Sequence, residues 1–395
     1  MNIPQGFRLA GVHCGIKRNA QRPDITLILC DRPAVAAGVY TQNQVFAAPV
    51  QVDRERTPND STRVVVANSG NANACTGSQG LEDARAMCAL AADACGVTDS
   101  SVLVMSTGII GQPLPMQKIE RGIRAAADQL ADSEQGVLAA ARGIMTTDTV
   151  PKVASRSLDL QGTTVRLLGI AKGAGMIGPR MATMLSVILT DATLDPSSAQ
   201  ELLDDVVQQT FNCISVEGHT STNDTVLLLA SGAAGGVGLS DGFQTAFRGA
   251  VTDLATELAR AIPADGEGAT HLITIDVCGC QRAEEARTIA GAVANSPLVK
   301  TAIAGGDPNW GRIVSAAGYA GVPFAAAEVD LRLNGCLLYR QGMPVAFDAQ
   351  QVSASIREHR ETSIELSVGS GPAAARFWTS DLTAEYVRIN ADYHT

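Results

Sequence analysis

A glycine-rich loop that runs into a strongly apolar segment constrains this chain more than any other feature. It occupies residues 172–192, with the sequence KGAGMIGPRMATMLSVILTDA. Glycine allows a positive φ and a close approach of the backbone to other groups, whereas proline fixes φ. The loop contains Gly173, Gly175, Gly178 and Pro179. It can therefore hold a strained backbone next to a more rigid element.

The rigid element follows directly. Residues 184–189 are apolar apart from Ser186, which is typical of a short strand buried on both faces. Thr183 stands between the loop and this strand. A threonine hydroxyl is a poor nucleophile without a base, and the nearest base is the nitrogen of Thr183 itself, which is an amide until its bond to Ala182 is cut.

Cleavage of that bond would produce the missing base. Attack of the Thr183 hydroxyl on the Ala182 carbonyl gives an ester by an N→O acyl shift, and water hydrolyses the ester. The new α-amine has a reference pKa of roughly 7.7–8.0 and can take up the hydroxyl proton. The sequence therefore predicts a self-cleaving chain with Thr183 as the nucleophile. The alternative interpretation is a glycine loop before a core strand that Thr183 merely begins.

The composition is that of a globular protein without a nucleic-acid or membrane partner. The 395 residues, 46% of them hydrophobic, suffice for two or three domains. The net charge of −10 and the absence of basic clusters with interleaved aromatic residues argue against nucleic acid. Residues 1–20 lack the apolar core of a signal peptide, and no run of about 18 apolar residues occurs. We expect a cytoplasmic protein.

Cysteine and histidine spacing gives no sign of disulfides or of a metal site. The nine cysteines form no CxxC pair, and the five histidines show no HxxxH spacing. We therefore expect reduced, mostly buried thiols and no metal ion.

Apolar periodicity and turn residues predict alternating strands and helices, and hence an α/β architecture. Strands are expected at 24–30, 62–68, 101–105, 184–189, 225–230 and 271–277. Helices are expected at 81–95, 116–130, 134–144, 197–210 and 241–261. A smaller second unit is expected from about residue 280, with a helix at 282–294, a turn-rich loop at 305–311 and strands at 325–333 and 363–368.

Motifs along the whole chain resemble those of the ornithine acetyltransferase family, the glutamate N-acetyltransferases of arginine biosynthesis. The loop described above is similar to the family's self-cleavage site, KGSGMI-x-PNMATML. Arg180 departs from the family's usual Asn, and His219 stands where an acidic residue is usual. The other similar stretches are AGVHCGIKRNAQRPDITLI near the N-terminus, VVVANSGNANACTG (64–77), MSTGIIG (105–111), MTTDTVPK (145–152), STNDTVLLLASG (221–232), ADGEGAT (264–270), ANSPLVKTAIAGGDPNWGRI (294–313) and the terminal YVRINADYHT.

The resemblance implies a fold and an assembly. It implies a four-layer, sandwich-like α/β core around the nucleophile, built from both cleaved chains, 1–182 and 183–395, and a smaller C-terminal α/β domain. We expect the core over residues 1–280 and the smaller domain over 281–395, with its tail in the site. An assembly of two 1–182 and two 183–395 chains is also implied.

The resemblance implies that Thr107 and Gly108 form the oxyanion hole. An acyl transfer passes through a tetrahedral oxyanion, and one donor aimed at it is typically worth about 2.7–4 kcal/mol. These two residues offer a hydroxyl and a backbone N–H at the end of an expected strand. The alternative is a Thr-Gly turn that merely closes the strand.

The substrate residues follow from the same motifs. Lys172 suits an α-carboxylate, Thr146 or Thr147 could donate a hydroxyl, and Glu267 could face an ornithine ammonium. An acidic residue in a glycine-flanked loop is otherwise usually only solvated.

The C-terminal tail is expected to reach the site. Asn390 and Thr395 match family positions that enter it, and the run YVRIN at 386–390 is expected to form a strand that anchors the tail. The asparagines of the 64–77 motif are expected to support the site without a catalytic role: Asn68, Asn71 and Asn73.

The predicted reaction is a ping-pong acetyl transfer. N-acetylornithine gives its acetyl group to Thr183, ornithine leaves, and glutamate takes the acetyl group to become N-acetylglutamate, with no cofactor. The resemblance leaves acetyl-CoA open as a second donor. Two other classes stay open, an N-terminal-nucleophile aminopeptidase that releases its acyl group to water, and an uncleaved amino-acid-binding protein.

Overall fold

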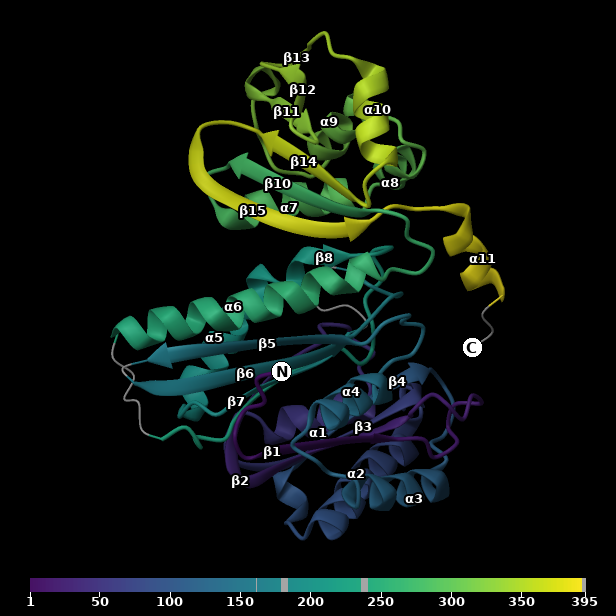
Figure 1. Ribbon diagram of the computed structural model, residues 1–395. Coiled ribbons are helices and arrows are strands. Elements are labelled where there is room, and N and C mark those ends of the chain that lie inside the picture. The colour runs from purple at the N-terminus through teal and green to yellow at the C-terminus, as the bar shows by residue number, and fades with distance from the viewer. Residues whose placement is uncertain (161, 179–183, 236–240, 393–395) are drawn as a thin grey trace.

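The computed structural model describes residues 1–160, 162–178, 184–235 and 241–392 (Figure 1). The predicted site residues Ala182, Thr183 and Thr395 lie outside the described residues. Within the described part of the chain, the strands form two sheets with helices packed on both.

The first sheet has the strand order β4-β3-β2-β9-β7-β6-β5, with β1 paired to β2. Its strands are β1 (Phe7–Val12), β2 (Ile25–Tyr40), β3 (Asn59–Asn71), β4 (Val102–Ile109), β5 (Lys152–Leu160), β6 (Thr163–Lys172), β7 (Leu185–Thr190) and β9 (Thr225–Ala230). The helices around it are α1 (Ala48–Arg56), α2 (Gly77–Cys95), α3 (Met116–Ala127), α4 (Glu134–Gly143), α5 (Pro196–Gln209) and α6 (Asp241–Ala264).

The second sheet has the order β13-β12-β11-β14-β10-β15-β8. Its strands are β8 (Ile214–Ser215), β10 (Leu272–Gly279), β11 (Asp330–Leu333), β12 (Cys336–Arg340), β13 (Met343–Pro344), β14 (Glu361–Ser367) and β15 (Gly371–Ser380). The remaining helices are α7 (Ala283–Ala294), α8 (Pro297–Ala304), α9 (Trp310–Gly318), α10 (Ala349–Arg357) and α11 (Ala384–Asp392).

Alternation along the strands builds a core of four layers, α–β–β–α. In β3, Val64 and Val66 face the α2/α3 helices, while Val65 faces the interior between the two β layers. In β9, Leu227 faces that same interior and Leu228 faces α5 and α6. Both faces of these strands are therefore buried, which explains their nearly continuous apolar sequences.

The long strand β2 joins the two β layers. Its first part, residues 25–29, pairs with β3, and its last part, residues 35–40, pairs with β9. The pairing with β3 shifts register between Leu29 and Ala34. An irregularity of this kind bends a strand, so one strand can serve both layers.

Helix α6 links the core to the second sheet. One side of α6 contacts β5 and β6, and the other side contacts β8 and β15 (Figure 1). Helix α7 covers β10 and β15. Strand β10 ends just before the predicted domain boundary at residue 280, yet its sheet neighbours are β14 and β15. The division into 1–280 and 281–395 stays a prediction.

The predicted α/β class is confirmed, and several elements differ from expectation. The strand at 225–230 has the predicted bounds. The expected loop at 305–311 is shorter because the Asn309 side chain accepts a hydrogen bond from Arg312 N and starts α9 at Trp310. Of the expected strand at 325–333, only Asp330–Leu333 forms a strand, since Ala326–Glu328 forms a 3₁₀ turn.

The prediction that YVRIN forms a strand was wrong, because these residues lie in helix α11. Valine and isoleucine at alternate positions suggested a strand, but this segment pairs with neither sheet. A Glu385–Arg388 ion pair of 2.6 Å and a bond of 3.0 Å from Asn390 Nδ2 to Tyr386 O stabilise the helix locally.

Two further expectations concern cysteines and membranes. All nine cysteines are free thiols in the described chain, and the expectation of mostly buried thiols is confirmed only in part, because four are buried, three are half-buried and two are exposed. No helix in the described part of the chain combines the length and the apolar composition that a membrane span requires.

Candidate active site

A cavity of about 330 Å³ lies at one edge of the first sheet, where β4 and β6 end and β9 begins. It brings together side chains from segments far apart in the sequence. The predicted site residues that line it are Thr107, Gly108, Thr146, Thr147, Lys172, Glu267 and Asn390. Their individual roles stay predictions, as do those of Ala182, Thr183 and Thr395, which are not among the described residues.

Thr107 and Gly108 lie at the carboxyl end of β4. Gly108 has a φ of 135° and packs against β3 so closely that a Cβ atom would lie 2.3 Å from the carbonyl carbon of Gly70. Only glycine fits this position. The tight packing fixes the backbone of Gly108 at the cavity wall, next to the buried side chain of Thr107.

Lys172 ends β6 and brings a buried cation to the cavity. Its side chain is among the largest fully buried ones, and the residue is only 2% exposed. Burial lowers the pKa of the Lys172 ammonium, and the charge of Asp148 opposes that shift. Lys172 lines the cavity, where its ammonium can meet an anionic ligand.

A buried ion network surrounds Lys172. Asp148 accepts hydrogen bonds from Thr146 N (2.9 Å), Gly173 N (2.6 Å) and Lys152 Nζ (2.8 Å). Burial alone would raise the pKa of Asp148, but the ammoniums of Lys172 and Lys152 hold it below its usual range. Lys152 also binds Asp265 Oδ2 at 2.7 Å, so it joins the loop after α4 to the loop after α6.

Glu267 forms another part of the cavity lining. A Cβ atom at Gly175 would lie 2.4 Å from the carboxyl carbon of Glu267, so a larger residue at this position would displace the Glu267 side chain. Asn390 Nδ2 on α11 donates to Glu267 Oε2 at 3.0 Å. The tail therefore reaches the cavity through a helix, and the contact of Asn390 with Glu267 places both side chains on one wall.

Three cavity residues from the STND motif had no predicted role: Ser221, Thr222 and Asn223. Asn223 Nδ2 donates to Ala72 O (2.6 Å) and Ser106 O (2.8 Å), which ties the loop before β9 to β3 and β4. The signal in the sequence is a run of polar residues directly before a fully apolar strand. Such a run at a strand end marks the edge of the sheet, where sites form.

The asparagines of the 64–77 motif brace the neighbouring loops. Asn68 Nδ2 donates to Asn71 O (2.8 Å), and Ser106 Oγ donates to Asn68 Oδ1 (2.6 Å). Asn71 Nδ2 donates to Pro113 O (3.1 Å), and Asn73 Nδ2 to Gly80 O (2.8 Å). Each of these asparagine side chains donates to a backbone carbonyl, so the three residues support the loops around the cavity.

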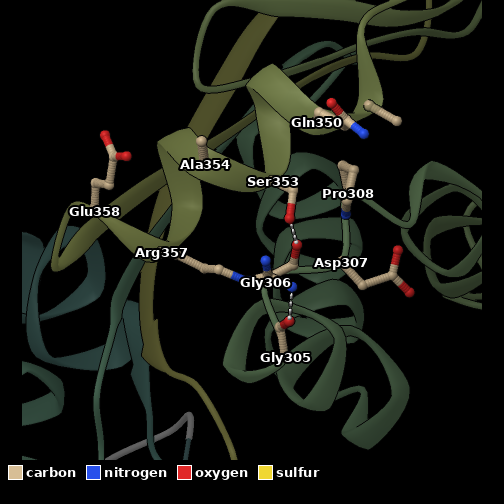
Figure 2. A pocket seen from close by; sticks show the side chains of 10 residues that line it. Gly305, Gly306, Asp307, Pro308, Gln350, Ser353, Ala354, Arg357 and Glu358 are labelled. Atoms are coloured by element: carbon tan, nitrogen blue, oxygen red, sulfur yellow. Dashed lines mark hydrogen bonds between the residues drawn. The ribbon is translucent and has the colours of Figure 1, made fainter.

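A second and larger hollow, of about 690 Å³, lies between the 305–308 loop and α10 (Figure 2). Its polar side chains already hold the loop to the helix, because Ser353 Oγ donates to Gly306 O (2.6 Å) and Arg357 Nη2 to Gly305 O (3.3 Å). None of the described residues predicted for the site lines this hollow. We therefore place the candidate active site in the smaller cavity at the edge of the first sheet.

Within residues 1–160, 162–178, 184–235 and 241–392, no three His, Cys, Asp or Glu side chains gather closely enough to hold a metal ion. The expectation of a reaction without metal or cofactor stays a prediction.

Comparison with known proteins identifies the family. A model described as the ArgJ family matches residues 8–395. The arginine biosynthesis bifunctional protein ArgJ of Rhodopirellula baltica is 48% identical over 397 residues, which cover 100% of this chain and 96% of the relative. The protein of the same name from Symbiobacterium thermophilum is 46% identical over 398 residues, with coverage of 100% and 98%.

A crystal structure also matches. It is that of the arginine biosynthesis bifunctional protein argJ of Bacillus halodurans, with a TM-score of 0.52 and 38% identity over 53% of this chain and 100% of that chain. The resemblance to the ornithine acetyltransferases is thus confirmed over nearly the whole sequence, and the chain belongs to the ArgJ family.

Proposed function

We propose that this protein transfers an acetyl group from N-acetylornithine to glutamate through an acetyl ester on Thr183. The observation that carries this proposal is the cavity at the sheet edge. It gathers an oxyanion-hole candidate (Thr107, Gly108), a buried cation (Lys172) and a carboxylate (Glu267). Lys172 pairs with Leu185, the first residue of β7, which follows Thr183 and Met184 in the sequence.

The cavity suits an amino acid that carries an acylated α-amine. The Lys172 ammonium would bind the α-carboxylate, since a buried, charge-assisted contact is strong. Glu267, which lines the same cavity, would bind the δ-ammonium of ornithine. Thr146 and Thr147, which line the same cavity, would donate hydroxyl hydrogen bonds to the substrate.

The chemistry would proceed in two half-reactions. The Thr183 hydroxyl attacks the acetyl carbonyl, the Thr183 α-amine takes the hydroxyl proton, and ornithine leaves with that proton on its amine. Glutamate then attacks the ester and gives its proton back to the oxygen of Thr183. Thr107 and the Gly108 N–H would stabilise the oxyanion in both steps.

The length of the matched crystal structure supports self-cleavage. The Bacillus halodurans chain is matched along its whole length by 53% of this chain. A fragment that begins at Thr183 would make up about that share of the sequence. We propose cleavage between Ala182 and Thr183 into chains 1–182 and 183–395, and an assembly of two such pairs.

The variant Thr183→Ala tests the proposal. It should remain one full-length chain on denaturing electrophoresis and should transfer no acetyl group from N-acetylornithine to glutamate. If that variant is cut at the same bond, the nucleophile assignment is wrong. If the wild-type protein releases acetate at the rate at which it consumes N-acetylornithine, the aminopeptidase alternative holds. If it is active and uncut, the self-cleavage scheme fails.

A second donor follows from the names of the relatives, which describe bifunctional proteins. We propose acetyl-CoA as this donor. Incubation with acetyl-CoA and glutamate alone should form N-acetylglutamate, and its absence would restrict the enzyme to recycling of the acetyl group. Sedimentation would check the assembly, and imaging of a tagged chain the proposed cytoplasmic location.

A further inference from the structure

The two ends of the segment that carries the proposed cleavage site are held by a single loop. Residues 216–224 lie between β8 and β9. On one side, Ile177 O accepts hydrogen bonds from Val216 N (2.8 Å) and Gly218 N (3.0 Å). On the other side, Met184 N donates to Asp224 Oδ1 at 2.9 Å. This nitrogen belongs to the peptide link that follows Thr183 directly.

Asp224 is an unusual anchor because half of its carboxyl group is unused. The residue is fully buried, and its second oxygen, Oδ2, has no hydrogen-bond partner. The Thr41 hydroxyl lies beside it but donates to Ser221 O (2.6 Å) instead. A buried polar atom without a partner costs free energy, which calls for a functional reason.

The surroundings keep this carboxyl group protonated near neutral pH. Burial raises the pKa of Asp224 to about 8, against the opposing effects of the Met184 N–H, Thr41 and the Lys172 ammonium. Lys172, on β6, is the charged side chain that acts on it, whereas the residue just before β7 presents the Met184 N–H and the residue just after β2 is Thr41. A neutral carboxyl group can both give and accept a proton.

We propose that Asp224 serves the self-cleavage reaction, holding the backbone after Thr183 through Oδ1 and carrying a proton between the two reacting atoms of Thr183 through Oδ2. This inference rests on the proposed function, because it requires Thr183 to be the nucleophile. It assigns a role to a residue that the acetyl-transfer scheme does not use.

The protons balance in the acyl shift from the Thr183 nitrogen to the Thr183 oxygen. The Thr183 oxygen forms a bond to the Ala182 carbonyl carbon, and the bond from that carbon to the Thr183 nitrogen breaks. The carboxyl group of Asp224 gives its proton to the departing nitrogen and regains one from the attacking hydroxyl. The product is the ester with a free amine, and Asp224 returns to its starting state. Water then hydrolyses the ester.

The test measures the rate of self-cleavage. The full-length chain is made by cell-free synthesis and incubated at pH values from 6 to 9.5, and the uncut and cut chains are separated on denaturing gels over time. The variant Asp224→Asn keeps an oxygen that accepts the Met184 N–H but cannot carry the proton. We expect its cleavage to be slower by about 100-fold or more. In the wild-type chain, cleavage should slow about tenfold per pH unit above about 8, as Asp224 loses its proton.

Asp53 provides a matched control elsewhere in the fold. It is also buried, one oxygen accepts a backbone N–H (Val104 N, 2.8 Å), and the other oxygen has no partner. Burial raises the pKa of Asp53 as well. The variant Asp53→Asn should be cut at the wild-type rate. If it slows cleavage as much as Asp224→Asn, the effect is one of general stability and the proposal is wrong.

The remaining outcomes separate this proposal from the proposed function. If Thr183→Ala stays intact but Asp224→Asn is cut at the wild-type rate, only the role of Asp224 fails. If Thr183→Ala is cut, the proposed function fails. Should Asp224→Asn not fold, the wild-type pH profile decides, because cleavage that keeps accelerating up to pH 9.5 overturns the role of Asp224.

Discussion

The two walls of the cavity are built very differently. The inner wall, at the edge of the first sheet, carries Lys172, which lies among three buried ionisable side chains that do not line the cavity themselves: Asp148, Lys152 and Asp224. The outer wall includes α11, none of whose residues is buried and which reaches the cavity through Asn390.

This difference separates two tasks. The buried charges of Lys172 and Lys152 are little screened by water, so removing one should cost much activity or stability. Contacts on the outer wall compete with water, so removing one should change substrate affinity modestly. The four predictions below rank residues on this basis, and a reversed order would break the comparison.

The largest effect is expected for Lys172→Met. This variant removes the buried cation proposed to bind the substrate carboxylate and should lower kcat/KM for acetyl transfer by about 100- to 1000-fold. Steady-state kinetics with N-acetylornithine and glutamate measures it, after a denaturing gel has shown the extent of cleavage. Lys300→Met is the control, because Lys300 is equally buried, outside the cavity, and bonds to Thr379 Oγ1 (2.9 Å). Less than a tenfold loss would contradict the assignment.

The second prediction concerns stability. Lys152→Met leaves Asp148 and Asp265 without their shared cation and should lower the free energy of unfolding by about 3–5 kcal/mol. Urea denaturation measures the loss. The control Arg156→Met breaks the partly exposed Arg156–Glu257 pair (2.6 Å), which should cost below about 1 kcal/mol. Equal losses in the two variants would refute the distinction between buried and exposed pairs.

The buried pair of Asp148 and Lys152 also predicts how the stability depends on pH. The pKa of Asp148 lies below its ordinary value of 3.8, so its contribution to stability is present above that value and is lost as the pH falls through the lower, folded-state pKa. In Lys152→Met, burial is opposed by one fewer ammonium, so the loss should begin at a higher pH. Urea midpoints measured from pH 3 to pH 7 for both proteins would show the shift, and parallel curves would exclude it.

The third prediction concerns Glu267, which contacts Asn390 on the outer wall. Glu267→Gln should raise KM for N-acetylornithine by about tenfold and change KM for glutamate less, because only ornithine carries a δ-ammonium. Glu257→Gln, at an exposed position outside the cavity, is the matched control. An equal rise of KM for both substrates would mean that Glu267 does not discriminate between them.

The smallest effect is expected on α11. Asn390→Ala removes one hydrogen bond to Glu267 and should raise KM for N-acetylornithine by about two- to tenfold. Arg388→Ala, which breaks only the exposed Glu385–Arg388 pair of the same helix, should leave KM unchanged. A larger effect for Asn390→Ala than for Glu267→Gln would mean that Asn390 acts on the substrate other than through Glu267.

The sequence predicted best those parts of the fold whose residues are buried on both sides. The run TVLLLA at 225–230 forms β9 with the predicted bounds. Strands β5 and β6, which contain several polar residues, were not predicted. Helix α11 was mistaken for a strand because none of its residues is buried, so periodicity carried no information about it. Apolar periodicity reflects which side chains are buried, so it does not predict the secondary structure of a segment without buried residues.

For the site, local motifs predicted residues that do meet in one cavity, such as Thr107, Lys172 and Glu267. The same reasoning missed the partnership of Lys152 with Asp265 and the burial of Asp224. Each depends on groups more than 35 residues away in the chain. An aspartate in a polar run has no local mark that distinguishes a buried carboxyl group from a solvated one.

The pairing of β7 with β6 and of β9 with β2 determines how a cut before Thr183 would affect the folded protein. Strand β7 is hydrogen-bonded to β6 along residues 185–190, and β9 is hydrogen-bonded to β2 along residues 225–230. Each ladder joins a strand before the cut to a strand after it. Strands of the two pieces would therefore stay hydrogen-bonded in one sheet. The pieces would migrate as a single species on a native gel until a denaturant separated the strands. Scission would change the number of chain ends without creating a dissociable subunit.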